Sequence, residues 1–226
     1  MSARWDDMRP IRVVIVDDDA LVRRALRVFL EDADDIEVVA EAPDGIAGVA
    51  LVEQQRPDIV LLDMQMPRMG GVQAAHEIVR TVPNARILAI TTFGSIDMIL
   101  PMLRAGASGY LLKDAEPEAI IDAVRLVHAG AAALSAAITA RLIEAAQTGG
   151  VETTDEFPDG HLLSEREHET LLQLALGRSN AEIARSIHAS ESTVKTHVSS
   201  IMAKWRVNNR VQIIIRAARG GLVRFD

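Results

Sequence analysis

The sequence predicts an α/β domain with a five-stranded parallel sheet, followed by a small all-α domain of four helices. In roughly the first 130 residues, short apolar runs alternate with amphipathic stretches of helical period. A polar, acidic stretch at 148–161 interrupts this alternation, and from Leu162 onward only helical periods occur. Strands that alternate with helices are joined by right-handed crossovers, which place the strands parallel in one sheet.

The predicted strands are short, apolar and rich in Ile, Leu and Val. They lie at Ile11–Val16, Glu37–Ala40, Ile59–Leu62, Ile87–Ile90 and Gly109–Leu112. The predicted helices follow them at 20–30, 45–55, 71–80, 96–105 and 117–129. Five strand–helix units in about 130 residues is the length of a flavodoxin-like, doubly wound domain with helices on both faces of the sheet.

Capping residues predict the helices of the last part of the chain. Two pairs have capping-box spacing, Ser164 with Glu167 and Ser179 with Glu182, and they predict helices that begin near 165 and 180. Ser190 is a suitable N-cap for a third helix that runs to about Trp205. A fourth helix is expected at 209–219, before Gly220 and Gly221.

The charge is divided unevenly along the chain. The net charge of −8 is the sum of −8 over residues 1–130, −4 over 131–160 and +4 over 161–226. We therefore predict an α/β domain at 9–130, an Ala-rich helical extension and flexible acidic linker at 131–160, and a helical domain at 161–226. A basic last domain after an acidic first one indicates different partners, although a solvated basic face is also common.

Several classes of protein are excluded by composition. The chain has no cysteine, which excludes disulfides and thiolate metal sites and is typical of a reducing compartment. The first ten residues have no apolar signal core, and no run approaches the ~20 apolar residues of a membrane span. We therefore expect a cytoplasmic protein with no membrane partner.

Polar residues follow four of the predicted strands. They are Asp17 and Asp18 after the first strand, Asp63 after the third, Thr91 after the fourth and Lys113 after the fifth. Since the carboxyl ends of parallel strands meet at one edge of the sheet, these groups are expected in one crevice. Converging carboxylates suit Mg²⁺, and a lysine and a hydroxyl suit phosphoryl oxygens. Each residue taken singly has a structural explanation, such as a helix N-cap for Asp17 and Asp18, so their joint placement carries the inference.

Four stretches resemble the signature segments of receiver domains, in the family's order. They are IVDDDALVRRAL (15–26), LLDMQMPRMGG (61–71), ILAITTF (87–93) and AGASGYLLKD (105–114). The resemblance implies that Asp63 is the phosphoacceptor and that Mg²⁺ is bound by Asp17, Asp18, Asp63 and the backbone carbonyl of Gln65. It further implies that Lys113 pairs with phosphoryl oxygens, that Thr91 hydrogen-bonds them, and that Tyr110 is the aromatic residue that turns inward.

The run from Leu162 to Gln212 resembles the LuxR-type helix-turn-helix, especially SNAEIA (179–184) and STVKTHVSSI (192–201). With a preceding receiver, this indicates the NarL/FixJ group of two-component response regulators. The resemblance implies that 191–205 is the recognition helix in the DNA major groove. It implies that Lys195 and Thr196, then Ser199, approach base edges, and that phosphates contact Thr193, His197, Lys204 and Arg210. We expect Val194, Val198, Ile201 and Met202 in the core, and Trp205 as core or interface filler.

The preferred hypothesis is a transcription regulator switched by phosphorylation of Asp63 by a sensor histidine kinase. It would bind double-stranded DNA and form a homodimer when phosphorylated. It would not be an enzyme in the usual sense, because its only reaction would be self-dephosphorylation. The Ala-rich extension and the last helix are both candidate dimer interfaces.

Two alternatives remain. One is a DNA-binding regulator controlled by protein contacts or a ligand, with a vestigial acidic pocket. The other is a Mg²⁺-dependent phosphatase, but a haloacid-dehalogenase-type site would place a second aspartate at position 65, which is Gln65.

Overall fold

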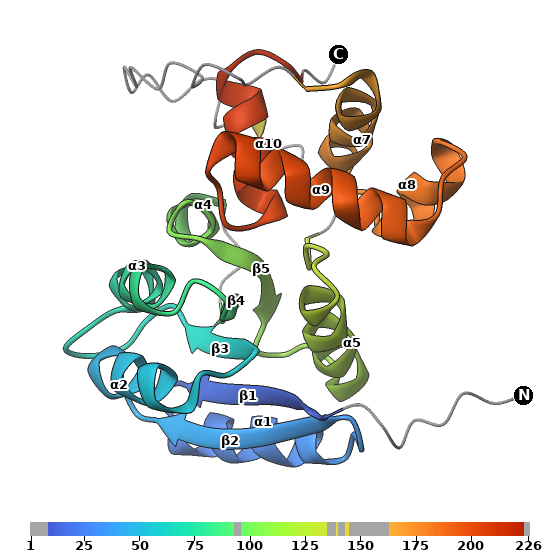
Figure 1. Ribbon diagram of the computed structural model, residues 1–226. Coiled ribbons are helices and arrows are strands. Elements are labelled where there is room, and N and C mark those ends of the chain that lie inside the picture. Colours follow the sequence, from blue (N-terminus) through green and yellow to red (C-terminus); the bar gives the residue numbers. More distant parts are fainter. Residues whose placement is uncertain (1–8, 93–95, 135–138, 140–142, 145–162, 224–226) are drawn as a thin grey trace, which may run out of the picture. The chain divides into compact units, whose positions relative to one another are not determined.

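The computed structural model describes residues 9–92, 96–134, 139, 143–144 and 163–223 (Figure 1). Most of the predicted helical extension and acidic linker therefore lies outside the described residues. Residues 9–92 and 111–128 form one compact unit, and the described residues of 93–110 and 129–226 form a second.

The strands form one five-stranded sheet with the order β2-β1-β3-β4-β5. The strands are β1 (Ile11–Val16), β2 (Ile36–Ala42), β3 (Ile59–Asp63), β4 (Arg86–Thr91) and β5 (Ala107–Leu112). The pairs β1–β2, β1–β3 and β3–β4 are parallel. This order is that of the flavodoxin-like doubly wound fold, as the alternating pattern predicts. β2 and β5 extend beyond their predicted bounds by two or three residues.

Helices follow each strand of this sheet. They are α1 (Ala20–Glu31), α2 (Gly45–Gln55), α3 (Gly71–Thr81), α4 (Ile96–Arg104) and α5 (Pro117–His128). In the first unit α1 packs against α5 and α2 packs against α3. All residues of β3 are buried, so both faces of the sheet are covered at its centre.

Aspartates cap the N-termini of α1 and α2. The Asp19 carboxylate caps α1 by accepting from the amide of Leu21 at 2.8 Å. Asp44 caps α2 by accepting from the amides of Ile46 and Ala47. A carboxylate at a helix N-terminus satisfies amides that have no helical partner and complements the helix dipole.

Four helices form the described C-terminal part of the second unit. They are α7 (Glu165–Ala175), α8 (Asn180–Ser186), α9 (Glu191–Trp205) and α10 (Arg210–Arg219). Both predicted capping boxes are present, and Ser190 caps α9 as expected. Val194, Val198, Ile201 and Trp205 are buried in the core as predicted, whereas Met202 is only half-buried. The described residues contain no helix with the length and apolar character of a membrane span.

Candidate functional site

Two buried aspartates and one lysine meet at the carboxyl ends of β1, β3 and β5. The Lys113 Nζ atom lies 2.7 Å from Asp17 Oδ2 and 3.2 Å from Asp63 Oδ1. Asp17 is completely buried and Asp63 is 3% exposed. The topology explains this meeting, because parallel strands direct all of their carboxyl ends to one edge of the sheet.

The third carboxylate, that of Asp18, belongs to the same cluster. One oxygen each of Asp17, Asp18 and Asp63 lies within 4.8 Å of the others, and Asp18 is the exposed member. Apart from the ion pair with Lys113, Asp17 Oδ2 has no hydrogen-bond partner among the described residues. A buried carboxylate oxygen with spare acceptor capacity, beside two further carboxylates, fits a hard divalent cation such as Mg²⁺.

Burial and mutual repulsion shape the protonation of this cluster. Burial and the charge of Asp17 raise the pKa of Asp63 above its usual value, although Lys113 partly offsets them. Burial alone lowers the pKa of Lys113, but its hydrogen bonds and charge interactions with Asp17 and Asp63 raise it overall. Lys113 therefore stays cationic at neutral pH, which a group that pairs with phosphoryl oxygens must do.

Thr91 is the last residue of β4, and Gln65 lies in the loop that follows β3. Thr91 is 2% exposed, and its carbonyl accepts from the amide of Lys113 at 2.8 Å, which joins the ends of β4 and β5. Gln65 is exposed, two residues beyond Asp63 in the turn that leads to α3. Tyr110 is half-buried on β5, and its amide donates to the carbonyl of Ala133 at 3.2 Å.

The turn after β3 depends on a glycine. A Cβ atom at Gly71 would lie 2.2 Å from the carbonyl oxygen of Asp63, a distance that no side chain tolerates. The amide of Gly71 also donates to the carbonyl of Met64 at 3.1 Å. Gly71 therefore permits α3 to start directly against the end of β3, which fixes the backbone of Asp63.

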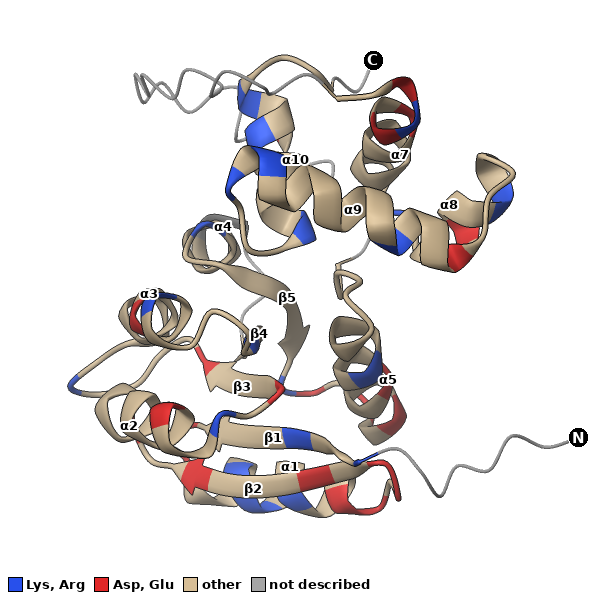
Figure 2. Cartoon of the chain, viewed as in Figure 1, with Lys and Arg blue, Asp and Glu red and all other residues tan. Residues whose placement is uncertain are grey.

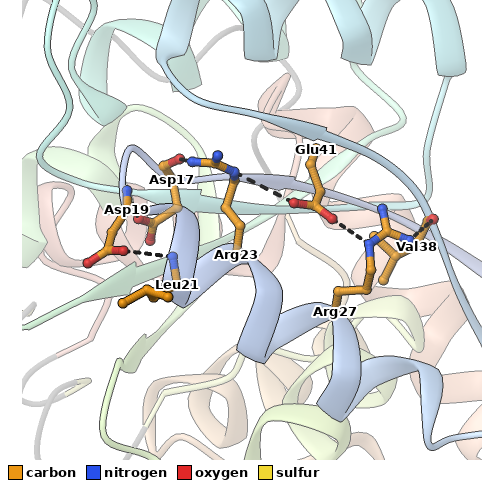
Figure 3. Close-up of polar contacts among 7 residues, drawn as sticks. All are labelled: Asp17, Asp19, Leu21, Arg23, Arg27, Val38 and Glu41. Atoms are coloured by element: carbon orange, nitrogen blue, oxygen red, sulfur yellow. Dashed lines mark hydrogen bonds and ion pairs between the residues drawn. The ribbon is translucent and has the colours of Figure 1, made fainter.

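Sequence reasoning missed Arg23 on α1. Its guanidinium donates to the backbone carbonyl of Asp17 at 2.6 Å and lies 3.6 Å from the Glu41 carboxylate on β2 (Figure 3). An arginine inside an amphipathic helix normally indicates a solvated face, so only the packing of α1 against β2 identifies this one.

Helix α9 presents an exposed polar face in the second unit. Thr193, Lys195, Thr196 and Ser199 are exposed, while Val194 and Val198 are buried on the opposite side. The Thr196 hydroxyl donates to the carbonyl of Ser192 at 3.0 Å. Basic residues occur in the last turns of α9 and α10, and acidic residues in the first turn of α7 (Figure 2).

The structure corrects the expectation that Arg210 contacts DNA phosphate. Arg210 is 4% exposed, and its guanidinium donates to the carbonyl of Arg178 at 2.6 Å and to Asn180 Oδ1 at 3.3 Å. Burial lowers its pKa to about 10, so the group remains charged at neutral pH. Arg210 therefore holds the turn between α7 and α8 and has almost no exposed surface for a phosphate.

His197 and Lys204 are engaged within the same unit. His197 Nδ1 lies 3.1 Å from the hydroxyl of Thr170, which is fully buried on α7. Lys204 Nζ donates to Glu167 Oε2 at 2.6 Å. Both side chains therefore join α9 to α7, a role that the sequence analysis did not assign to either residue.

Comparison with protein families finds two matches. Residues 13–125 match the family described as "Response regulator receiver domain". Residues 161–217 match "Bacterial regulatory proteins, luxR family". The two matched segments fall inside the segments predicted as receiver and DNA-binding domains, whose bounds stay predictions.

Relatives match over nearly the whole chain. "Uncharacterized transcriptional regulatory protein YxjL" of Bacillus subtilis is 40% identical over 218 residues, which cover 94% of this chain and 97% of the relative. "Nitrate/nitrite response regulator protein NarP" of Escherichia coli is 37% identical over 206 residues, which cover 91% and 94%.

Solved structures agree with these relatives. The response regulator ChrA of a heme-sensing two-component system is 35% identical with a TM-score of 0.51, covering 96% of this chain and 100% of ChrA. The receiver domain of NarL from Mycobacterium tuberculosis is 34% identical with a TM-score of 0.53, covering 54% of this chain and 99% of that domain. The chain therefore belongs to the two-component response regulators of the NarL type, transcription regulators that join a receiver domain to a LuxR-type DNA-binding domain.

Proposed function

We propose that Asp63 is the phosphoacceptor of this response regulator and that a sensor histidine kinase is its donor. The single observation that carries the proposal is the contact of Lys113 with both Asp17 and Asp63, at 2.7 and 3.2 Å, in a cluster of three carboxylates. A carboxylate oxygen of Asp63 attacks phosphorus, the P–N bond of the kinase phosphohistidine breaks, and the imidazole leaves with the bonding electrons.

Each group of the cluster has a proposed part in this transfer. Asp17, Asp18, Asp63 and the backbone carbonyl of Gln65 would hold Mg²⁺, which when bound neutralises charge on the phosphoryl oxygens. The Lys113 ammonium, already beside Asp63, pairs with a phosphoryl oxygen. The hydroxyl of Thr91 then hydrogen-bonds the phosphoryl group, and Tyr110 turns inward in response.

The output is DNA binding through α9. Lys195, Thr196 and Ser199 are proposed to approach base edges, and Thr193 to contact phosphate, because all four are exposed on one helix. Phosphorylation is proposed to favour a homodimer on double-stranded DNA in the cytoplasm. The protein turns over no separate substrate, and loss of phosphate from Asp63 is self-dephosphorylation.

Phosphoryl labelling tests the assignment of Asp63. Wild-type protein is incubated with labelled acetyl phosphate, with Mg²⁺ or with EDTA, and the label on the protein is counted. We expect Mg²⁺-dependent label on wild type and on Asp58→Ala, a control aspartate outside the cluster, and none on Asp63→Ala. Equal labelling of Asp63→Ala and wild type would falsify the assignment and favour the phosphatase or vestigial-pocket alternatives.

A further inference from the structure

A small network of charged residues on α1 and β2 adjoins the acidic cluster (Figure 3). Arg23 NH1 donates to the carbonyl oxygen of Asp17 at 2.6 Å, and Arg23 Nε lies 3.6 Å from Glu41 Oε2. The other oxygen of Glu41 accepts from Arg27 Nε, and Arg27 also donates to the carbonyl of Val38 at 3.3 Å. Glu41 thus holds both arginines on one side of α1.

Arg23 contacts a backbone atom that lies between two aspartates of the cluster. The Asp17 carbonyl belongs to the peptide unit that joins Asp17 to Asp18, and a peptide unit is planar. A charge-assisted hydrogen bond to this carbonyl therefore limits the backbone rotations on both sides of the unit. Asp17 and Asp18 are two of the three carboxylates in the cluster, so Arg23 acts on the relative placement of both.

Among the described residues, the ion pair of Arg23 is to Glu41 and not to a carboxylate of the cluster. The Arg23 side chain is 16% exposed, and its ionic partner is Glu41. Asp17 Oδ1 instead accepts from the amide of Asp19 at 2.9 Å, and Asp17 Oδ2 contacts Lys113. Since Glu41 compensates the guanidinium, Arg23 orders the acidic turn and leaves the carboxylate oxygens to a cation.

We propose that Arg23 is a positioning residue for the Mg²⁺ and phosphoryl site, held in place by Glu41. This inference rests on the proposed function, because it presumes that Asp17 and Asp18 bind Mg²⁺. Partners outside the coordination shell orient ligating groups, and their loss typically weakens metal binding by roughly 10- to 100-fold.

Arg27 provides a matched control on the same helix. It lies one turn beyond Arg23 and shares Glu41 as a partner, but its other hydrogen bonds go to Glu31 and the carbonyl of Val38. Arg27→Ala removes the same charge and side-chain length from α1 without touching the Asp17–Asp18 peptide unit.

Calorimetric titration of the full chain with MgCl₂ tests the proposal. We expect Arg23→Ala to raise the Mg²⁺ dissociation constant by roughly tenfold or more, and Arg27→Ala to match wild type. Arg23→Lys, which keeps the charge but reaches fewer acceptors, should lie between them. In labelling with acetyl phosphate, the half-saturating Mg²⁺ concentration should rise by the same factor, while the rate at saturating Mg²⁺ changes less.

The outcomes separate this inference from the proposed function. Urea unfolding tests whether each variant is folded. If Arg23→Ala does not fold, the Mg²⁺ affinity of Arg23→Lys tests the positioning role. Equal Mg²⁺ affinity of the Arg23 variants and Arg27→Ala would overturn the positioning role alone. Tighter binding by Arg23→Ala would also overturn it, because Arg23 would then act only as a repelling charge. Absence of Mg²⁺ binding by wild type would overturn both proposals.

Discussion

Asp63 is an ionisable group in a place that disfavours its charge. Burial and the neighbouring Asp17 carboxylate raise its pKa, and Lys113 offsets only part of this effect. For an acid whose pKa is raised by folding, protonation is favoured in the folded state. Its stabilising contribution is thus present at low pH and is lost as the pH rises through the folded pKa.

Asp63→Asn should therefore raise the free energy of unfolding of the metal-free protein at pH 8, and change it less at pH 4. The amide keeps the size of the side chain and removes the repulsion with Asp17. Urea unfolding followed by far-UV circular dichroism in EDTA measures this difference, with the exposed Asp18→Asn as a control of smaller effect. A lower urea midpoint for Asp63→Asn at pH 8 would contradict the expected repulsion.

In the second unit, the pKa of Glu167 is shifted in the opposite direction to that of Asp63. It is 5% exposed and accepts from Ser200 Oγ, Lys204 Nζ and the amide of Ser164, each at 2.6 Å. Burial alone raises its pKa, but these hydrogen bonds together lower it to about 2. For an acid with a depressed pKa, the stabilisation is present above the unfolded value and is lost as the pH falls through the folded one.

Glu167→Gln should destabilise the second unit by about 2 to 3 kcal/mol at pH 7, and by less at pH 3. The glutamine keeps the size of the side chain but loses the ion pair with Lys204. Trp205 is fully buried in this unit, so its fluorescence in a Trp5→Phe background reports the unfolding. Glu182→Gln, at the matching position of the exposed capping box of α8, is the control and should cost less. An equal loss at both glutamates would argue against a special role for the Lys204 pair.

Helix α9 has one face that packs in the core and one that is exposed. Val194, Val198, Ile201 and Trp205 anchor one side in the core, and His197 and Lys204 tie the same helix to α7. The exposed side carries Lys195, Thr196 and Ser199. A helix that is fixed on one side presents the other in a constant orientation, which sequence-specific reading of a groove requires.

Lys195→Ala should weaken binding to a specific DNA fragment by about 1 to 3 kcal/mol at fixed salt. The fragment is obtained by selecting genomic DNA with the wild-type protein, and fluorescence anisotropy over a salt series measures the affinity. Arg166→Ala removes another exposed basic residue, on α7, where it pairs with Glu169, and should leave the affinity unchanged. An unchanged affinity for Lys195→Ala across the series would exclude α9 as the reading helix.

For the whole molecule, the proposed function is a change of state that is driven from one site and read at another. The receiver pocket and the exposed face of α9 belong to different units of the chain. Phosphorylation shifts the equilibrium between two conformational states only if the phosphoryl group interacts more favourably with one of them. A large shift needs a difference of several kcal/mol in that interaction.

Beryllofluoride with Mg²⁺, which mimics a phosphoryl group on an aspartate, should increase both dimer formation and DNA affinity. Sedimentation velocity and anisotropy on the selected fragment measure the two effects at one protein concentration. With beryllofluoride and Mg²⁺, Asp63→Ala should show no increase in dimer formation or in DNA affinity. A wild-type protein whose dimer fraction and DNA affinity both stay constant would mean that the pocket does not control the output.

The sequence alone determined the elements and the place of the acidic cluster. Apolar periodicity is a local property, so Ile11–Val16 and Gly45–Gln55 were predicted with their observed bounds. Capping boxes are equally local, and both were predicted correctly. The meeting of Asp17, Asp63 and Lys113 follows from topology, because parallel strands have their carboxyl ends at one edge.

Only the tertiary structure decided which polar side chains serve packing and which are free for a ligand. From the sequence, Arg210 and Lys204 were both expected to contact phosphate. In the structure, Arg210 is buried and bonded to Arg178 and Asn180, and Lys204 is paired with Glu167. Arg23 resembles a surface residue but contacts the carbonyl of Asp17. The physical reason is that burial and pairing depend on which distant segments come together, and no local pattern of residues carries that information.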